Sequence, residues 1–300
     1  FLIDAAVLVL LVLIGMQYFN TAIEKYYAFN HNTVEDKAIF NHLLWNLSHN
    51  LSWQNTVHFY TDNYLSNHFS LIYLPLSFIY ALWAKPEMCW LMLDVALAGG
   101  LFLLYRLAAV RLRTRLGAFM AVILLVAHPM FSRNLLIEGW RDTAWAVCFL
   151  CLALWAWERK RFALFMTGFV FAALCKEDIP FIGIGFTALA FIQRRTWRWK
   201  IFPACFGILY ACLAFWTMRH LGDIWEGQDL SRYAYLGKPG PEALWNMIVH
   251  PGLWIRQVFS PAKMSAMRDL FGPLGYLSFL APEFLIVPAS QFAEVLLADQ

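Results

Sequence analysis

Four long apolar runs constrain this chain more than any other feature of its sequence. Residues 5–19, 88–105, 143–157 and 201–218 each approach the length that a helix needs to cross a hydrocarbon core. The composition agrees, because 61% of the 300 residues are hydrophobic and only 14% are charged, whereas soluble domains have roughly half and a quarter. Since the runs are continuous rather than alternating, they predict an all-α polytopic membrane protein rather than a β-barrel.

Basic residues indicate the orientation of these runs. The positive-inside rule places three basic clusters in the cytoplasm, with two spans between successive clusters. The segments 131–142, 175–178 and 219–271 then face the external side. The clusters are Arg106, Arg111, Arg113 and Arg115; Arg159, Lys160 and Arg161; and Arg194, Arg195, Arg198 and Lys200.

The N-terminal third leaves two topologies open. If the N-terminus is cytoplasmic, residues 20–67 form an external loop and residues 69–84 form a juxtamembrane or re-entrant helix. If it is external, residues 69–84 span the membrane and the loop is cytoplasmic. The loop carries two lysines against four acidic residues, which is not the basic composition of a cytoplasmic loop, so we favour the first topology.

The simplest organisation is a single transmembrane domain over residues 1–300. Within loop 20–67, the apolar spacing from Val34 to Leu47 predicts an amphipathic helix. Two further short interfacial helices are predicted at 241–249 and 252–259. The sequence opens on Phe1 and stops at Gln300 just after an apolar stretch, so we expect both ends to be incomplete.

A polar interruption between two apolar runs is the strongest candidate for a functional site. Cys175-Lys176-Glu177-Asp178 places three ionisable residues beside the membrane, where unpaired charge costs several kcal/mol. On the favoured topology the same side also gathers other polar residues: Glu35, Asp36, His68, Glu138, Arg141, Asp142 and Arg232.

This set of residue types suits transfer from a lipid-linked phosphosugar. A carboxylate can act as a general base toward an acceptor hydroxyl. Lysine and arginine can hold a phosphate and stabilise its charge as it leaves, and paired carboxylates can bind Mg²⁺ or Mn²⁺. Each residue also has a structural alternative. Asp36 suits the start of a helix, Glu138, Arg141 and Asp142 suit an ion-paired loop, and Lys176 can simply pair with a neighbouring carboxylate.

Four motifs, in this order, resemble the DUF2079 family of predicted prokaryotic membrane proteins, which is similar to the GT-C type glycosyltransferases. The resemblance extends over nearly the whole chain. The motifs are Asp36-x-x-Ile39-Phe40 continuing to Leu44-Trp45-Asn46, His68-Phe69-Ser70, Cys175-Lys176-Glu177-Asp178 and Leu280-Ala281-Pro282-Glu283.

The resemblance implies a GT-C-like transmembrane helix bundle in the inner membrane of a prokaryote, with juxtamembrane helices in the first external loop. It implies a glycosyltransferase that moves a sugar from a polyprenyl phosphate to an external acceptor, with Mg²⁺ or Mn²⁺ in some cases. On this template Asp36 is the catalytic base. Substrate binding is implied for His68, Arg141, Lys176, Glu177 and Arg232, and metal binding for Glu138 and Asp142.

The chain departs from the family pattern at Asn41, His42 and Leu71, and carries Gly139-Trp140-Arg141-Asp142 in place of a Phe-His-Pro-Glu stretch. These departures leave two alternatives open. One is a catalytically lapsed GT-C scaffold that acts as an accessory subunit of a larger membrane complex. The other is a transporter, for which charges at helix breaks are typical. The expected partners are a polyprenyl-phosphate lipid, membrane lipids and membrane-complex subunits, and the sequence carries no nucleic-acid-binding signature.

Overall fold

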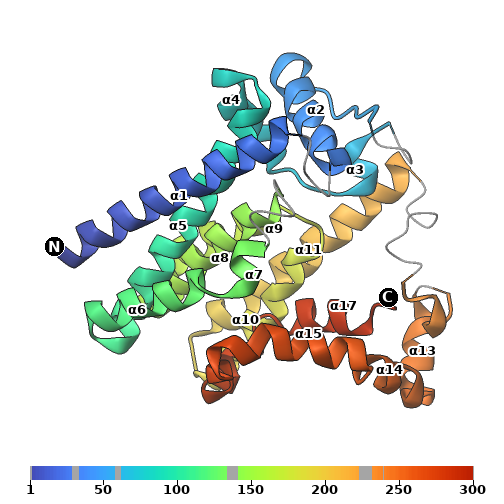
Figure 1. Ribbon diagram of the computed structural model, residues 1–300. Helices are drawn as coiled ribbons and strands as arrows, with labels where there is room; N and C mark the ends of the chain where they lie inside the picture. The colour runs from blue at the N-terminus through green and yellow to red at the C-terminus, as the bar shows by residue number, and fades with distance from the viewer. Residues whose placement is uncertain are drawn as a thin grey trace. The chain divides into compact units, whose positions relative to one another are not determined.

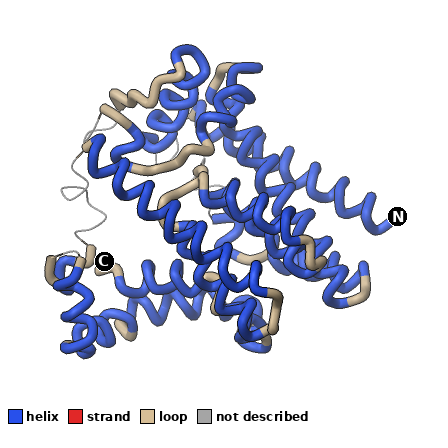
Figure 2. Tube along the Cα trace, turned by 180° about the vertical axis from the view of Figure 1, so that it is seen from behind, coloured by secondary structure: helices blue, strands red, loops and turns tan. Residues whose placement is uncertain are grey.

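The computed structural model describes residues 2–28, 34–57, 62–133, 141–222, 232–238 and 240–299, except for the side chains of 34–36, 132, 133 and 244. Most of these residues are in helices joined by loops, with one isolated bridge between Gln54 and Asn63 and no strand (Figure 2). The all-α prediction is therefore confirmed over the described part of the chain. The helices group into two compact units, Phe1–Pro180 and Phe181–Gln300, which are described separately.

Three described helices are long and apolar enough to cross a membrane: α1 (Leu2–Tyr27), α5 (Pro86–Leu112) and α11 (Trp197–Leu221). They contain three of the four apolar runs. The fourth run lies in α8 (Thr143–Glu158), which has only 16 residues. Such a helix rises about 24 Å, less than the roughly 30 Å of a hydrocarbon core. The run at 143–157 is bounded by Asp142 and Glu158, so the helix expected to span there is shorter than a full crossing.

In the first unit, α1 and α5 lie side by side and run antiparallel (Figure 1). At one end Asp4 accepts a hydrogen bond from the Tyr105 hydroxyl at 2.7 Å and pairs with Arg115 at 2.8 Å. At the other end the Tyr27 hydroxyl donates to Glu87. Residues 28–85 therefore leave and re-enter the helix pair at the same end. In the favoured topology, α1 and α5 likewise cross the membrane in opposite directions. The side of the membrane that this end faces stays a prediction.

The remaining apolar helices of the first unit are α6 (Arg115–Val126), α8 and α9 (Phe162–Ala173). Helix α8 packs parallel to α5, because Gly100 lies against Cys148 while Arg111 pairs with Glu158 at 2.7 Å. Helix α9 returns antiparallel along α8. The first two basic clusters thus gather at one end of the unit, and residues 175–178 lie at the other.

Three short helices form a layer over the end of the unit that carries residues 175–178. They are α2 (Val34–Asn50), α3 (Tyr64–Asn67) and α4 (Tyr73–Tyr80). Helix α2 buries the apolar face that its sequence spacing predicts, at Ile39, Leu43, Leu44 and Leu47. The Phe40 and Tyr73 rings stack with centroids 5.9 Å apart, and Tyr64 meets Tyr73 edge-on at 5.5 Å. We call α2, α3 and α4 the juxtamembrane layer.

The second unit begins with a hairpin of α10 (Ile182–Ile192) and α11, in which Thr187 Oγ1 accepts from the Ala204 backbone N–H at 3.2 Å. The predicted interfacial helices at 241–249 and 252–259 correspond to the first two of the short helices that follow. These are α13 (Pro241–Val249), α14 (Pro251–Val258), α15 (Pro261–Phe271), α16 (Pro282–Leu285) and α17 (Ala289–Leu297).

Candidate functional site

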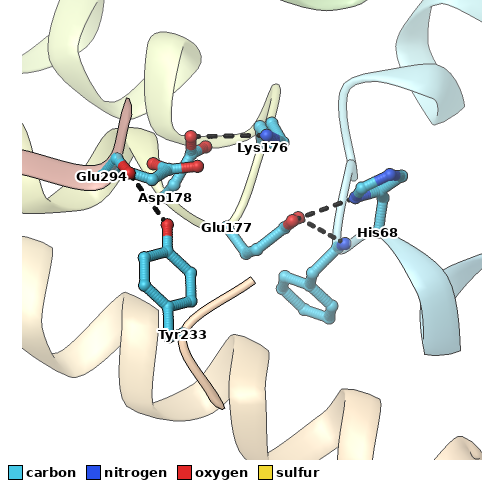
Figure 3. Close-up of polar contacts among 7 residues, drawn as sticks. His68, Lys176, Glu177, Asp178, Tyr233 and Glu294 are labelled. Atoms are coloured by element: carbon cyan, nitrogen blue, oxygen red, sulfur yellow. Dashed lines mark hydrogen bonds and ion pairs between the residues drawn. The ribbon is translucent and has the colours of Figure 1, made fainter. Parts of the chain in front are cut away.

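Glu177 connects two loops of the first unit. Its Oε1 lies 3.0 Å from His68 Nδ1, and its Oε2 accepts a hydrogen bond from the Phe69 backbone N–H at 3.0 Å (Figure 3). The Glu177 side chain is 10% exposed and the His68 side chain 26%. Both carboxylate oxygens therefore have partners in a nearly water-free position, where such bonds are stronger than at the surface.

The local structure explains why these two loops meet. Helix α3 ends at Asn67, and His68 continues in an extended conformation with its N–H bonded to the Tyr64 carbonyl. The Ile72 N–H then donates to the Leu174 carbonyl, just beyond the end of α9, at 2.9 Å. A backbone hydrogen bond and the Glu177 contacts thus hold the start of α4 against the end of α9.

Lys176 lies beside this contact. Its Nζ is 3.4 Å from Asp178 Oδ2, and both side chains keep part of their surface in solvent, at 27% and 21% (Figure 3). A long, partly hydrated ion pair of this kind contributes little to stability. The contact with Asp178 therefore does not by itself hold Lys176 firmly in place.

Asp142 brings a third segment to the same place. It immediately precedes α8, is 7% exposed and makes no side-chain cap to the helix. Burial raises the pKa of Asp142 to about 6, with the nearby Ser70 hydroxyl and the charge of His68 partly offsetting the effect. We call His68, Asp142, Lys176 and Glu177 the polar cluster.

In the His68–Glu177 contact each group favours the ionised form of the other. Burial alone lowers the pKa of His68, but the charge and hydrogen bond of Glu177 outweigh it, so the pKa is raised from 6.5. Burial alone raises the pKa of Glu177, but the His68 charge and hydrogen bond outweigh it, so the pKa is lowered from 4.5. Glu177 thus favours the charged form of the imidazole.

Sequence reasoning missed Tyr64 beside the polar cluster, and it named Ser70 and Cys175 only as members of motifs, without a role in the site. Tyr64 is 2% exposed, and its pKa is raised well above 10 by burial and by the Asp142 and Glu177 carboxylates. Ser70 is fully buried. Cys175 is also fully buried, and burial raises the pKa of its thiol. No spacing in the sequence distinguishes Tyr64 or Ser70 from ordinary packing residues.

The structure brings together four of the residues that the sequence singled out, namely those of the polar cluster. Arg141 is exposed. Arg232 is an exposed residue of the second unit whose backbone carbonyl accepts from the Asp299 N–H at 2.7 Å. Asp36 lies in the first turn of α2, but its side chain is outside the described part of the chain, and Glu138 lies outside it altogether.

Metal binding by Glu138 and Asp142 stays a prediction, because Glu138 lies outside the described part of the chain. Among the residues that the structure describes, no group of three His, Cys, Asp or Glu side chains is placed to hold a metal ion. Asp142 lies near Lys176 and His68, and the positive charge of Lys176 does not favour a bound cation. We therefore derive no chemical step through a metal.

The sequence matches the family model described as Predicted membrane protein (DUF2079) over residues 25–300. This range contains the juxtamembrane layer, the polar cluster and two of the three long apolar helices. No curated protein and no solved structure matches the chain significantly. With a family match over most of its length and helices able to cross a bilayer, the chain belongs to the DUF2079 family of predicted membrane proteins.

Proposed function

We propose that this membrane protein is a GT-C-like glycosyltransferase that moves a sugar from a polyprenyl phosphate to an acceptor on the external face of a prokaryotic inner membrane. The polar cluster is the observation that carries the proposal. It lies where apolar helices end and the juxtamembrane layer begins, and we expect this level to coincide with the lipid phosphates of a bilayer. It also offers two cations, His68 and Lys176, in a partly dehydrated position.

The cations suit the leaving group of this reaction. When the sugar leaves, negative charge develops on the polyprenyl phosphate, and Lys176 and the imidazolium of His68 stabilise it. Glu177 acts through His68, because it holds the ring in place and raises its pKa. Glu177 is thus a positioning residue, and Lys176 is the group that exchanges Asp178 for phosphate.

The base in this proposal is Asp36, in the first turn of α2 within the juxtamembrane layer. Its carboxylate takes the proton of the acceptor hydroxyl while the hydroxyl oxygen attacks the anomeric carbon of the sugar. The bond from that carbon to the phosphate oxygen breaks, and its electron pair leaves with the polyprenyl phosphate. Attack from the opposite face inverts the anomeric configuration.

The test is a transfer assay on the full-length protein in nanodiscs. A panel of undecaprenyl-phosphate-linked sugars supplies the donor, water takes the place of the acceptor hydroxyl, and mass spectrometry measures the free sugar and the released undecaprenyl phosphate. We expect release by the wild type, none by Asp36→Asn, and strongly reduced release by Lys176→Ala. Lys160→Ala, at the other end of the first unit, is the matched control. A parallel series with EDTA and added Mg²⁺ or Mn²⁺ tests the metal. Release that survives Asp36→Asn contradicts the assignment of the base.

A second candidate function is an accessory subunit of a larger membrane complex. One observation favours it: both oxygens of Glu177 already have partners and hold the juxtamembrane layer on α9, as a purely structural contact would. On this alternative, mild solubilisation yields a stoichiometric complex, and no donor of the panel is turned over.

A further inference from the structure

A second charged site lies at the opposite end of the first unit, where α5 ends and α6 begins. A cavity of about 370 Å³ opens there between the ends of α1, α5 and α6. Three arginines and one aspartate provide its charged groups, so its charge is positive. The residues that matter here are Asp4, Arg106, Val110, Arg113, Thr114 and Arg115.

Only one of the three arginines is neutralised by the cavity's own acid. Arg115 Nη1 lies 2.8 Å from Asp4 Oδ2, and Asp4 also accepts from Tyr105 at 2.7 Å. Arg106 lies over the Phe102 ring, 5.9 Å from its centroid. Arg113 has no carboxylate partner among the described residues. The cavity therefore retains positive charge that an anion can neutralise.

The backbone is strained at Arg113, one of the arginines that line the cavity. Arg113 ends α5 in the left-handed conformation, with φ 54° and ψ 21°. This conformation costs a residue with a side chain about 1 kcal/mol or more, and it persists where the surrounding structure requires it. Here it reverses the chain between α5 and α6, so that three consecutive residues, 113–115, line the cavity.

The start of α6 adds hydrogen-bond donors to the arginines. Thr114 precedes this 12-residue helix but makes no side-chain capping bond. The first backbone N–H groups of α6 therefore lack a side-chain acceptor, and the helix dipole favours an anion beside them. Guanidinium groups and helix N-termini are the two protein features that bind phosphate oxygens best.

Apolar groups around the cavity select a lipid over a free anion. Val110 forms part of its wall. Leu112 and Leu116, which flank the lining residues 113–115 in the sequence, are 53% and 61% exposed. We propose that this basic pocket binds the phosphate of an anionic phospholipid, whose acyl chains lie along Leu112 and Leu116. The site is independent of the polar cluster, which lies at the other end of the first unit.

Native mass spectrometry of the full-length protein tests this directly. The protein is purified in detergent and titrated with phosphatidylglycerol, cardiolipin or phosphatidylcholine. We expect an anionic lipid to be retained at least about tenfold more strongly than phosphatidylcholine, the equivalent of one charge-assisted hydrogen bond. Equal retention of all three lipids overturns the proposal.

Three variants distinguish lipid binding in the pocket from a general effect of basic residues and from a loss of folding. Arg106→Ala and Arg113→Gly are each expected to lose about tenfold in retention of the anionic lipid. Arg113→Gly also relieves the left-handed backbone, so it keeps or raises the thermal stability of the protein. Arg161→Ala, an exposed arginine of the neighbouring basic cluster, is expected to change nothing. If Arg161→Ala has the same effect as Arg113→Gly, the pocket is not the site.

A competition arm distinguishes a lipid from a soluble phosphate. Inorganic phosphate and glycerol phosphate are added at rising concentration to the protein with bound phosphatidylglycerol. We expect neither to displace the lipid at equimolar concentration, because neither contacts the apolar rim. Displacement by either compound at equimolar concentration overturns the assignment to a lipid.

Discussion

His68 and Glu177 are 109 residues apart in the sequence, yet His68 Nδ1 lies 3.0 Å from Glu177 Oε1. The carboxylate also bonds the backbone of the residue after the histidine. One acidic side chain therefore sets both the position of a loop and the charge of an imidazole. The proposed function depends on this pair, because Glu177 favours the charged form of His68 beside Lys176, where the proposal places the lipid phosphate.

Glu177→Gln tests the dependence of His68 on its partner. The amide keeps the shape and can accept from Phe69, but it removes the charge that outweighs burial. We therefore expect the pKa of His68 to fall, and the protein to lose about 1–2 kcal/mol of stability. NMR of labelled histidine measures the pKa, and thermal unfolding measures the stability. Glu24→Gln, an exposed acid at the end of α1, is the control. An unchanged His68 pKa contradicts the ion pair.

The ion pair also predicts how stability depends on pH. The raised pKa of His68 gives stabilisation that is complete below 6.5 and is lost as the pH rises through the folded-state value. The lowered pKa of Glu177 gives stabilisation that is present above 4.5 and is lost as the pH falls through the folded-state value. The difference in melting temperature between wild type and Glu177→Gln should therefore be largest between these limits. A difference that grows steadily above pH 7 would argue against the pair.

Asp142 changes the stability with pH in the direction opposite to Glu177. Its pKa is raised from 3.8 to about 6, so the folded protein holds this proton more tightly, and stability falls as the pH rises through that interval. We expect Asp142→Asn to stabilise the protein by about 3 kcal/mol at pH 7 and by less than about 1 kcal/mol at pH 4. Paired melting curves at the two pH values measure this. An equal gain at both values would show that the carboxylate carries no such cost.

Gly168 tests the packing that places the polar cluster at the end of α9. A Cβ at this position would lie 2.8 Å from both the Ala153 nitrogen and the Phe149 carbonyl oxygen of α8. Because backbone atoms cannot move aside locally, we expect Gly168→Ala to destabilise the protein by about 1–3 kcal/mol. Gly252→Ala is the matched control, since a Cβ there meets nothing within 4 Å. Equal melting temperatures for the two variants would contradict the close α8–α9 contact.

The sequence predicted the helical character and the polar interruption at residues 175–178 because both are local signals. Long apolar runs favour helices in a bilayer, because a helix satisfies its backbone hydrogen bonds within the segment. A lysine and two carboxylates between such runs indicate a site regardless of what surrounds them. The helical period in α2 likewise predicted which of its residues are buried.

The remaining features depend on contacts between distant segments. No pattern shows that His68 pairs with Glu177, or that Tyr64 and Ser70 surround the pair. The left-handed Arg113 was not predicted, since that conformation usually calls for glycine. The span expected at 143–157 was judged from hydropathy, whereas the length of α8 is set by the charged residues at its ends.

Binding of undecaprenyl phosphate to the purified full-length protein tests the proposed function most directly. Native mass spectrometry compares wild type, Lys176→Ala and the control Lys160→Ala. We predict saturable binding by the wild type and by Lys160→Ala, and binding at least about tenfold weaker by Lys176→Ala, because a phosphate loses one charge-assisted partner. Absence of binding by the folded wild type, or equal binding by all three proteins, would contradict a phosphate site at the polar cluster.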